Sequence, residues 1–78
     1  LQQQKGCMTM PTHIVANIKF YRDKFNVTQK ELAEAVNVRR ETIVNVENGK
    51  YNPSLKLGME IAQFFGVTVE EIFALQQD

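Results

Sequence analysis

The sequence contains little cysteine and no long apolar run. Its single cysteine, Cys7, cannot form a disulfide within the chain, so no covalent cross-link supports the core. The apolar runs fall far short of the ~20 residues that cross a bilayer, and no charged-then-apolar secretory leader opens the chain. At 78 residues, the chain has room for one small domain. We therefore expect a single cytoplasmic domain that is not a secreted scaffold, a membrane protein or a multidomain enzyme.

Groups for catalysis or metal binding are also scarce. The sequence has no Ser/His/Asp or Cys/His arrangement and no glycine-rich phosphate loop. His13 and Cys7 have no further metal ligands near them, and the adjacent Glu70 and Glu71 would point to different sides of a helix. We expect no enzymatic activity, no metal site and no cofactor.

The formal net charge of zero conceals an uneven distribution of charge along the chain. Residues 19–56 contain eight basic and five acidic residues, a net charge of +3. Residues 57–78 contain four acidic residues and no basic one, and the first 18 residues add only Lys5. A basic middle favours a nucleic-acid partner, whereas a neutral total argues against one, so charge alone does not decide.

The first eleven residues are polar and rich in glutamine. We interpret residues 1–11 as a flexible N-terminal arm or a remnant of cloning, and residues 12–78 as the folded domain. The apolar residues that follow are spaced by four, three and four, as on one helical face: Ile14, Ile18, Tyr21 and Phe25. This spacing predicts a first helix that begins at Pro11 or Thr12 and ends at Asn26.

Capping signals predict four more helices. Thr28–Glu31 and Thr68–Glu71 have the spacing of capping boxes, and Ser54 can cap the helix between them. The residues able to end helices in a left-handed conformation are Asn37, Gly49 after Asn48, and Gly66. The last helix would include Ile72, Phe73 and Leu75. The sequence shows no alternation of apolar and polar residues of the kind that strands have. We therefore predict an all-α, compact five-helix bundle without a sheet.

The second and third predicted helices are separated only by Asn37 and Val38. Helices joined by so short a turn must cross at a steep angle, which is the geometry of a helix-turn-helix. The residues expected in the core are Ile18, Leu32, Ala33, Val38, Ile43, Val46, Ile61 and Phe65.

Residues 28–54 read TQKELAEAVNVRRETIVNVENGKYNPS. This segment closely resembles the Cro/repressor-type helix-turn-helix, the xenobiotic-response-element class of bacterial and phage regulators. Their pattern runs roughly T-Q-x-x-L-A-x-x-x-G-V-S-x-x-x-I-S-x-x-E-N-G-x-x-x-P-S, and the likeness extends over about residues 13–75. The resemblance implies a lambda-repressor-like fold and a sequence-specific, double-stranded DNA-binding transcriptional regulator, most often a repressor that binds a palindromic operator as a homodimer.

Three positions depart from the family pattern. Asn37 replaces the helix-ending glycine, which leaves the fold intact because asparagine tolerates the same backbone conformation. Arg39 replaces the serine cap of the recognition helix, a cap worth ~1 kcal/mol. Val44 replaces a polar residue late in that helix. The last two departures bear on the specific contacts with DNA.

By resemblance, the recognition helix reads bases with Arg40, Glu41 and Asn45, and Thr42 and Val44 lie nearby. An arginine can bind guanine with two hydrogen bonds, an asparagine adenine, and a glutamate the cytosine amino group. The positions that the family uses for backbone phosphates are Thr28, Gln29, Arg39, Asn48, Lys50 and Tyr51. Arg22 and Glu47 match positions that form a structural ion pair in the family.

A single module reads too few base pairs to be selective in a genome, which favours a homodimer. The candidates for its surface are the apolar residues Phe64, Phe73 and Leu75. Because no sensor domain fits in the chain, a partner protein is a possible source of regulation. Two alternatives stay open: an antitoxin of a toxin–antitoxin pair with the same fold, and a helical protein–protein adaptor that has lost DNA binding.

Overall fold

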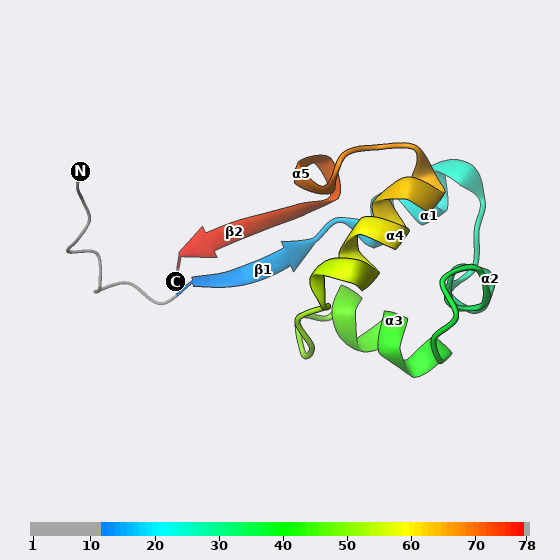
Figure 1. The fold of residues 1–78 in the computed structure, drawn as a ribbon, viewed down its shortest axis with the longest axis horizontal. Coiled ribbons are helices and arrows are strands. Elements are labelled where there is room, and N and C mark those ends of the chain that lie inside the picture. Colours follow the sequence, from blue (N-terminus) through cyan, green and yellow to red (C-terminus); the bar gives the residue numbers. More distant parts are fainter. Residues whose placement is uncertain (1–11, 78) are drawn as a thin grey trace.

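The computed structural model describes residues 12–77 (Figure 1). The elements in chain order are β1 (Thr12–Ala16), α1 (Ile18–Phe25), α2 (Gln29–Ala35), α3 (Arg40–Glu47), α4 (Leu55–Phe65), α5 (Val69–Ile72) and β2 (Phe73–Gln77). The arm expected at residues 1–11 lies outside the described residues. The prediction of a lambda-repressor-like fold with five helices is confirmed, and the chain is mostly helical.

The helices α1 to α4 all end in the same way. The residues with positive φ are Asn26 (59°), Asn37 (60°), Gly49 (75°) and Gly66 (72°). In each case the next amide donates a hydrogen bond back across the last turn: Val27 to Arg22, Val38 to Ala33, Lys50 to Asn45 and Val67 to Ala62, at 2.8–3.0 Å. This is the Schellman arrangement, which satisfies carbonyls that the helix itself leaves unpaired. The stops predicted from the sequence are confirmed.

The starts of α2, α4 and α5 also follow the sequence. Thr28 Oγ1 accepts a hydrogen bond from the Glu31 amide at 3.0 Å, while the Thr28 amide donates to Glu31 Oε1 at 2.8 Å. Thr68 and Glu71 form a second capping box at the start of α5. Ser54 Oγ accepts from the Leu57 amide at 3.1 Å and begins α4. These caps fix where each helix begins through contacts between near neighbours in the chain.

All five helices contribute to one apolar core. Its buried members are Ile18, Leu32, Ala33, Val36, Ile43, Val46, Leu57, Ile61, Ala62, Phe65 and Ile72. Seven of the eight residues predicted for the core are among them. The eighth, Val38, is half-buried and packs against the core from the turn between α2 and α3.

The prediction that no sheet would form was wrong. Strands β1 and β2 pair antiparallel, from Thr12 opposite Gln77 to Ala16 opposite Phe73. The first helix therefore begins at Ile18 rather than at residue 11 or 12, and the fifth ends at Ile72. Residues 12–16 form a strand instead of the start of a helix because they pair with residues 73–77, at the other end of the described chain. A backbone hydrogen bond from Asn17 to the Ile72 carbonyl, 2.7 Å long, closes the base of the sheet.

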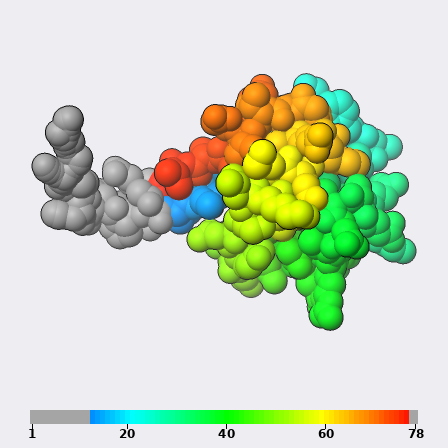
Figure 2. All heavy atoms as spheres, in the orientation of Figure 1, coloured from blue at the N-terminus to red at the C-terminus, as the bar shows by residue number. Residues whose placement is uncertain are grey.

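The sheet extends away from the helical body. In Figure 1 the two strands run side by side to the left of the helices, and in Figure 2 their atoms form a narrow extension. Helix α3 lies along the lower side of the body in the same view, apart from α5 at the top. The molecule therefore presents two separate features, a helical face and a projecting sheet.

Candidate DNA interface

The turn between α2 and α3 fixes how α3 is presented. Asn37 adopts the left-handed conformation and Val38 donates its amide to Ala33, so the chain turns sharply over residues 36–39 before α3 begins at Arg40. Ile43 and Val46 then anchor one side of α3 in the core, with almost no exposed surface. The opposite side of α3 must face outward because a helix cannot bury both sides against one body.

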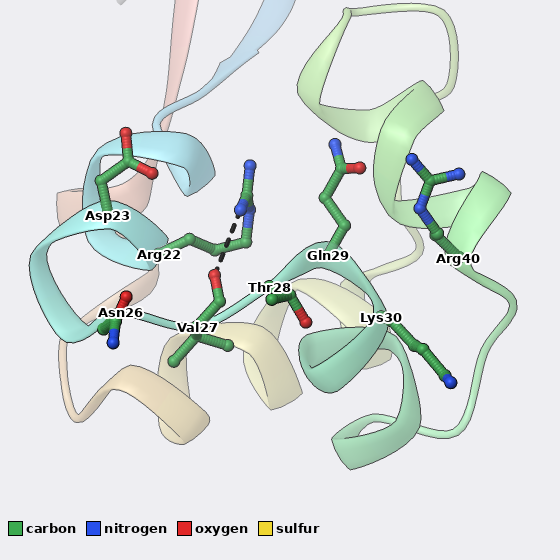
Figure 3. A pocket seen from close by; sticks show the side chains of 8 residues that line it. All are labelled: Arg22, Asp23, Asn26, Val27, Thr28, Gln29, Lys30 and Arg40. Carbon is green, nitrogen blue, oxygen red and sulfur yellow. Dashed lines mark hydrogen bonds between the residues drawn. The ribbon is translucent and has the colours of Figure 1, made fainter.

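The outward side of α3 carries the residues expected to read bases. Glu41 and Asn45 are exposed and follow one another at a spacing of four, so they form one line along the helix. Arg40 is also exposed and lies on the flank of α3 that faces the start of α2 (Figure 3). Thr42, half-buried, lies on the other flank, in a hollow that it shares with Tyr51. Val44 is half-buried.

A buried ion pair holds α3 against α1. Arg22 Nε lies 2.6 Å from Glu47 Oε2, and Arg22 Nη2 lies 3.2 Å from Glu47 Oε1. The two side chains are only 11% and 8% exposed. Arg22 Nη1 also donates to the Val27 carbonyl at 3.1 Å, the bond drawn in Figure 3. Two parallel bonds between a guanidinium and a carboxylate fix both distance and orientation. The structure thus joins the two residues that the sequence placed in a structural pair.

Gln29 extends this network to α2, which sequence reasoning missed. Its Nε2 donates to Glu47 Oε1 at 3.0 Å, so Glu47 holds α1, α2 and α3 together. The family resemblance implied only a contact with phosphate for Gln29. An amide nitrogen carries two hydrogens, and the bond to Glu47 uses one of them. The three-helix junction and an outward contact by Gln29 are therefore compatible.

An open hollow lies between the end of α1, the start of α2 and the start of α3 (Figure 3). Its lining residues are Arg22, Asp23, Asn26, Val27, Thr28, Gln29, Lys30 and Arg40. Lys30 and Arg40 are exposed, whereas the charge of Arg22 is balanced by Glu47. A hydrogen bond from Lys19 lowers the pKa of the Asp23 carboxyl. Lys30, which was not among the residues expected to contact DNA, lines this hollow beside Gln29 in the first turn of α2.

Four further phosphate candidates flank α3 at its two ends. Arg39 is exposed at the start of α3 and forms no side-chain cap bond, consistent with the lost serine. Asn48, Lys50 and Tyr51 are exposed in the loop that follows α3. With Thr28 and Gln29 on the α2 side, the polar candidates surround the outward side of α3.

The three candidates for a dimer surface do not lie together. The Phe64 ring contacts that of Phe65 on α4, with centroids 5.0 Å apart. Phe73 is half-buried and packs on the core beside Gly58 of α4. Leu75 is exposed on β2, in the projecting sheet. Phe64 and Leu75 cannot therefore belong to one small patch.

Within residues 12–77, no three histidine, cysteine or acidic residues gather closely enough to hold a metal ion. None of the helices in this described part combines the length and the apolar character that crossing a membrane requires.

Comparison with known proteins places these features in context. A family model described as helix-turn-helix matches residues 18–72, from the first residue of α1 to the last of α5. An uncharacterized HTH-type transcriptional regulator of Archaeoglobus fulgidus is 57% identical over 61 residues, which span 78% of this chain and 86% of that protein. The immunity repressor protein of Bacillus phage phi105 is 36% identical over 55 residues, 70% of this chain and 38% of that protein. The crystal structure of the transcriptional regulator VanUg has a similar fold, with a TM-score of 0.74 at 17% identity, over 96% of this chain and all of that one.

Proposed function

The chain belongs to the Cro/C1-type helix-turn-helix family of DNA-binding transcriptional regulators, and from this we propose that it recognises one specific duplex sequence with the outward side of α3. The family is one of regulators, not enzymes. The observation that carries the proposal is the exposed polar line of α3, held in place by the buried network around Glu47. In helix-turn-helix proteins the second helix lies in the major groove, and its N-terminal residues contact base edges.

The chemistry of the outward side fits base recognition. Arg40 can donate two hydrogen bonds to guanine, Asn45 can pair with adenine, and Glu41 can accept from the cytosine amino group. Each such pair discriminates by roughly 1–3 kcal/mol. The half-buried Val44 and Thr42 offer methyl groups to thymine. We propose these five residues as the base-reading set.

Backbone phosphates would bind on both flanks of α3. On the α2 side, Gln29 has an amide hydrogen left for a phosphate oxygen, and Lys30 adds positive charge at the rim of the hollow (Figure 3). Thr28 and Arg39 lie at the starts of α2 and α3. After α3, the exposed Asn48, Lys50 and Tyr51 would contact the backbone across the groove. Phosphate contacts position the protein but carry little sequence information.

We further propose that the protein is a repressor that acts in the cytoplasm as a homodimer on a palindromic operator. The likeness to a phage immunity repressor supports repression. The small size of one reading helix supports the dimer, because one module meets too many competing sites in a genome. Two copies related by a twofold axis would read half-sites about one helical turn, ~34 Å, apart.

Selection of bound sequences from a random duplex pool, followed by salt titration, tests this function. We expect one palindromic consensus, and an affinity for it that falls by orders of magnitude from low to moderate salt as counterions are released. A pool that yields no enriched sequence, with no duplex binding at low salt, would contradict the proposal and indicate a protein–protein adaptor instead.

A further inference from the structure

Most of the aromatic side chains gather in one cluster on α1 and α4. The Phe65 ring lies at its centre, and three further ring centroids lie 5.0–6.0 Å from its own. Phe20 joins through Tyr21, which it meets edge to face at 5.1 Å. The sequence holds five phenylalanines and two tyrosines in all. The members of this aromatic cluster are Phe20, Tyr21, Phe25, Phe64 and Phe65.

The body covers only part of the aromatic cluster. Phe65 belongs to the core, but Phe20, Phe25 and Phe64 are 55%, 50% and 43% exposed. Neighbouring apolar side chains that stay in water mark a surface to which another molecule binds. Aromatic residues are also enriched at the centres of protein interfaces, where they contribute much of the binding energy. The exposed side of the cluster is therefore a candidate binding surface.

A notch opens in this surface where α1 and α4 end. Its lining side chains are all apolar, and its volume is about 220 Å³. Side chains that anchor protein complexes insert into pockets of this kind. A polar group would lose its hydrogen bonds to water there and gain none from the lining side chains, so the notch selects an apolar group. The lining residues are Phe25, Val27, Phe64 and Phe65.

Lys24 places a positive charge at the rim of this notch. Its Nζ lies 5.7 Å from the centroid of the Phe25 ring, within the range of a cation–π contact. Within residues 12–77, Lys24 forms no salt bridge, and the carboxylate of the neighbouring Asp23 pairs with Lys19 at 2.8 Å. An ammonium held beside an apolar surface attracts a carboxylate more strongly than one surrounded by water.

We propose that the notch binds a segment of another protein that inserts one leucine or aromatic side chain and places an aspartate or glutamate against Lys24. The apolar anchor fills the notch, and the carboxylate supplies the counter-charge that this surface lacks. The inference goes beyond the proposed function, because every residue assigned above to base or phosphate contacts lies between Thr28 and Tyr51, outside the aromatic cluster.

The chemistry of the surface favours such a segment over a second copy of this chain and over DNA. A twofold contact between copies would set one notch against the other and bring Lys24 near its own equivalent, a like charge. DNA does not fit the notch because its lining side chains donate no hydrogen bond to a phosphate. An acidic segment with one apolar anchor satisfies both the notch and the cation.

Random peptides displayed on phage and selected on the full chain are the first probe. We expect enriched peptides to combine leucine or an aromatic residue with a nearby aspartate or glutamate. Synthetic copies should bind Phe64→Ser at least about tenfold more weakly than the wild type, the loss typical of an anchoring contact. Leu55→Ser is the matched control, since Leu55 is 74% exposed but lies at the start of α4, and it should bind like the wild type. Circular dichroism melting shows whether each variant is folded.

Two results of this selection would overturn the proposal. One is that no peptide is enriched, and the other is that the enriched peptides bind a folded Phe64→Ser as tightly as the wild type. A wild-type dimer that becomes a monomer in Phe64→Ser, measured by analytical ultracentrifugation, would show that a second copy covers the notch and would overturn it as well.

Reversing the charge of Lys24 tests the acidic part of the partner in a variant whose change is confined to an exposed side chain. Lys24→Glu should weaken the selected peptides, and replacing their acidic residue with lysine should restore much of the loss. Lys50→Glu, an exposed lysine in the loop after α3, is the control and should leave peptide binding unchanged. Equal binding to Lys24→Glu and the wild type would overturn the proposed carboxylate contact.

Nuclear magnetic resonance locates the bound peptide. In the isotope-labelled chain, the amide signals that shift on adding a selected peptide should belong to the ends of α1 and α4, with Val27 and Phe64 among them. Shifts confined to α3 would place the peptide on the DNA-reading side and overturn the proposal.

Operator binding separates a failure of this inference from a failure of the proposed function. Phe64→Ser should bind the selected operator as tightly as the wild type while it loses the peptides. A chain that selects an operator but enriches no peptide would sink the docking surface alone. A chain that binds the acidic peptides but recognises no operator would sink the proposed function and leave the docking surface standing.

Discussion

The helical body and the projecting sheet differ in what holds them and in what they present. The body, residues 18–72, is delimited by local caps and braced by the buried pair of Arg22 and Glu47, and it presents a polar helix face. The sheet is held by pairing between the two ends of the described chain and presents uncharged edges. The helical body therefore coincides with the part that the family model matches, and the sheet lies outside that part.

Glu47→Ala should produce the largest loss of stability, because it removes the buried ion pair that holds α3 against α1. The substitution leaves the Arg22 guanidinium buried without its counter-charge and removes the acceptor that Gln29 uses. Breaking a buried pair in this way costs about 3–5 kcal/mol of unfolding free energy, measurable by urea denaturation. Glu41→Ala, on the exposed side of the same helix, is the control and should change stability by no more than about 0.5 kcal/mol. Similar losses in both variants would show that the pair does not brace the fold.

Arg40→Ala should be next in size and should change binding without changing assembly. We expect a loss of about 1–3 kcal/mol on the selected operator and a relaxed preference at one base pair. Titration of operator and random duplexes measures both effects, and sedimentation should show an unaltered dimer. If affinity for both duplexes fell alike, Arg40 would contact the backbone and not a base.

Gly58→Ala tests how the sheet is joined to the body. A Cβ at this position of α4 would lie 3.5 Å from the nearest atom of the Phe73 ring, an ordinary van der Waals distance. Since alanine is a better helix former than glycine, we expect a gain of up to about 1 kcal/mol, seen as a higher melting temperature. Gly58→Leu is the contrast, because its longer side chain would displace Phe73 and lower the melting temperature. Destabilisation by alanine would mean that Phe73 packs more tightly on α4 than this distance indicates.

Lys50→Ala should have the smallest effect, and the most uniform. Lys50 is exposed after α3, so its loss should weaken binding to all duplexes about equally. The slope of log affinity against log salt should become shallower by about one unit. Binding at several salt concentrations measures this slope. A loss confined to the operator would instead assign Lys50 to base recognition.

Much of the helical body could be predicted from the sequence because its signals are local. Thr28 and Glu31 cap α2 within four residues, and Asn26, Asn37 and Gly66 end helices through their own backbone preference. The resemblance carried by Thr28 to Ser54 is confirmed by the family match. The exposed side of α3 could be expected as well, since Ile43 and Val46 recur at helical spacing.

The sheet and the third member of the buried network could not be predicted in this way. Ile14 stands four residues before Ile18, a helical spacing, yet it lies in a strand because its partner is Leu75, 61 positions along the chain. Gln29 is 18 positions from Glu47, and no local pattern links an amide to a carboxylate across two helices. Both contacts form only when distant segments are packed together.

The sequence by itself determined where α2, α4 and α5 begin, where α1 to α4 end, and which family the chain belongs to, because caps and turns act between residues a few positions apart. The tertiary structure alone decided that both ends of the helical body continue into one sheet, and that Gln29 joins the ion pair of Arg22 and Glu47. The physical reason is that these contacts depend on the closure of long loops, whose geometry is set by the packed core and not by neighbours in the chain.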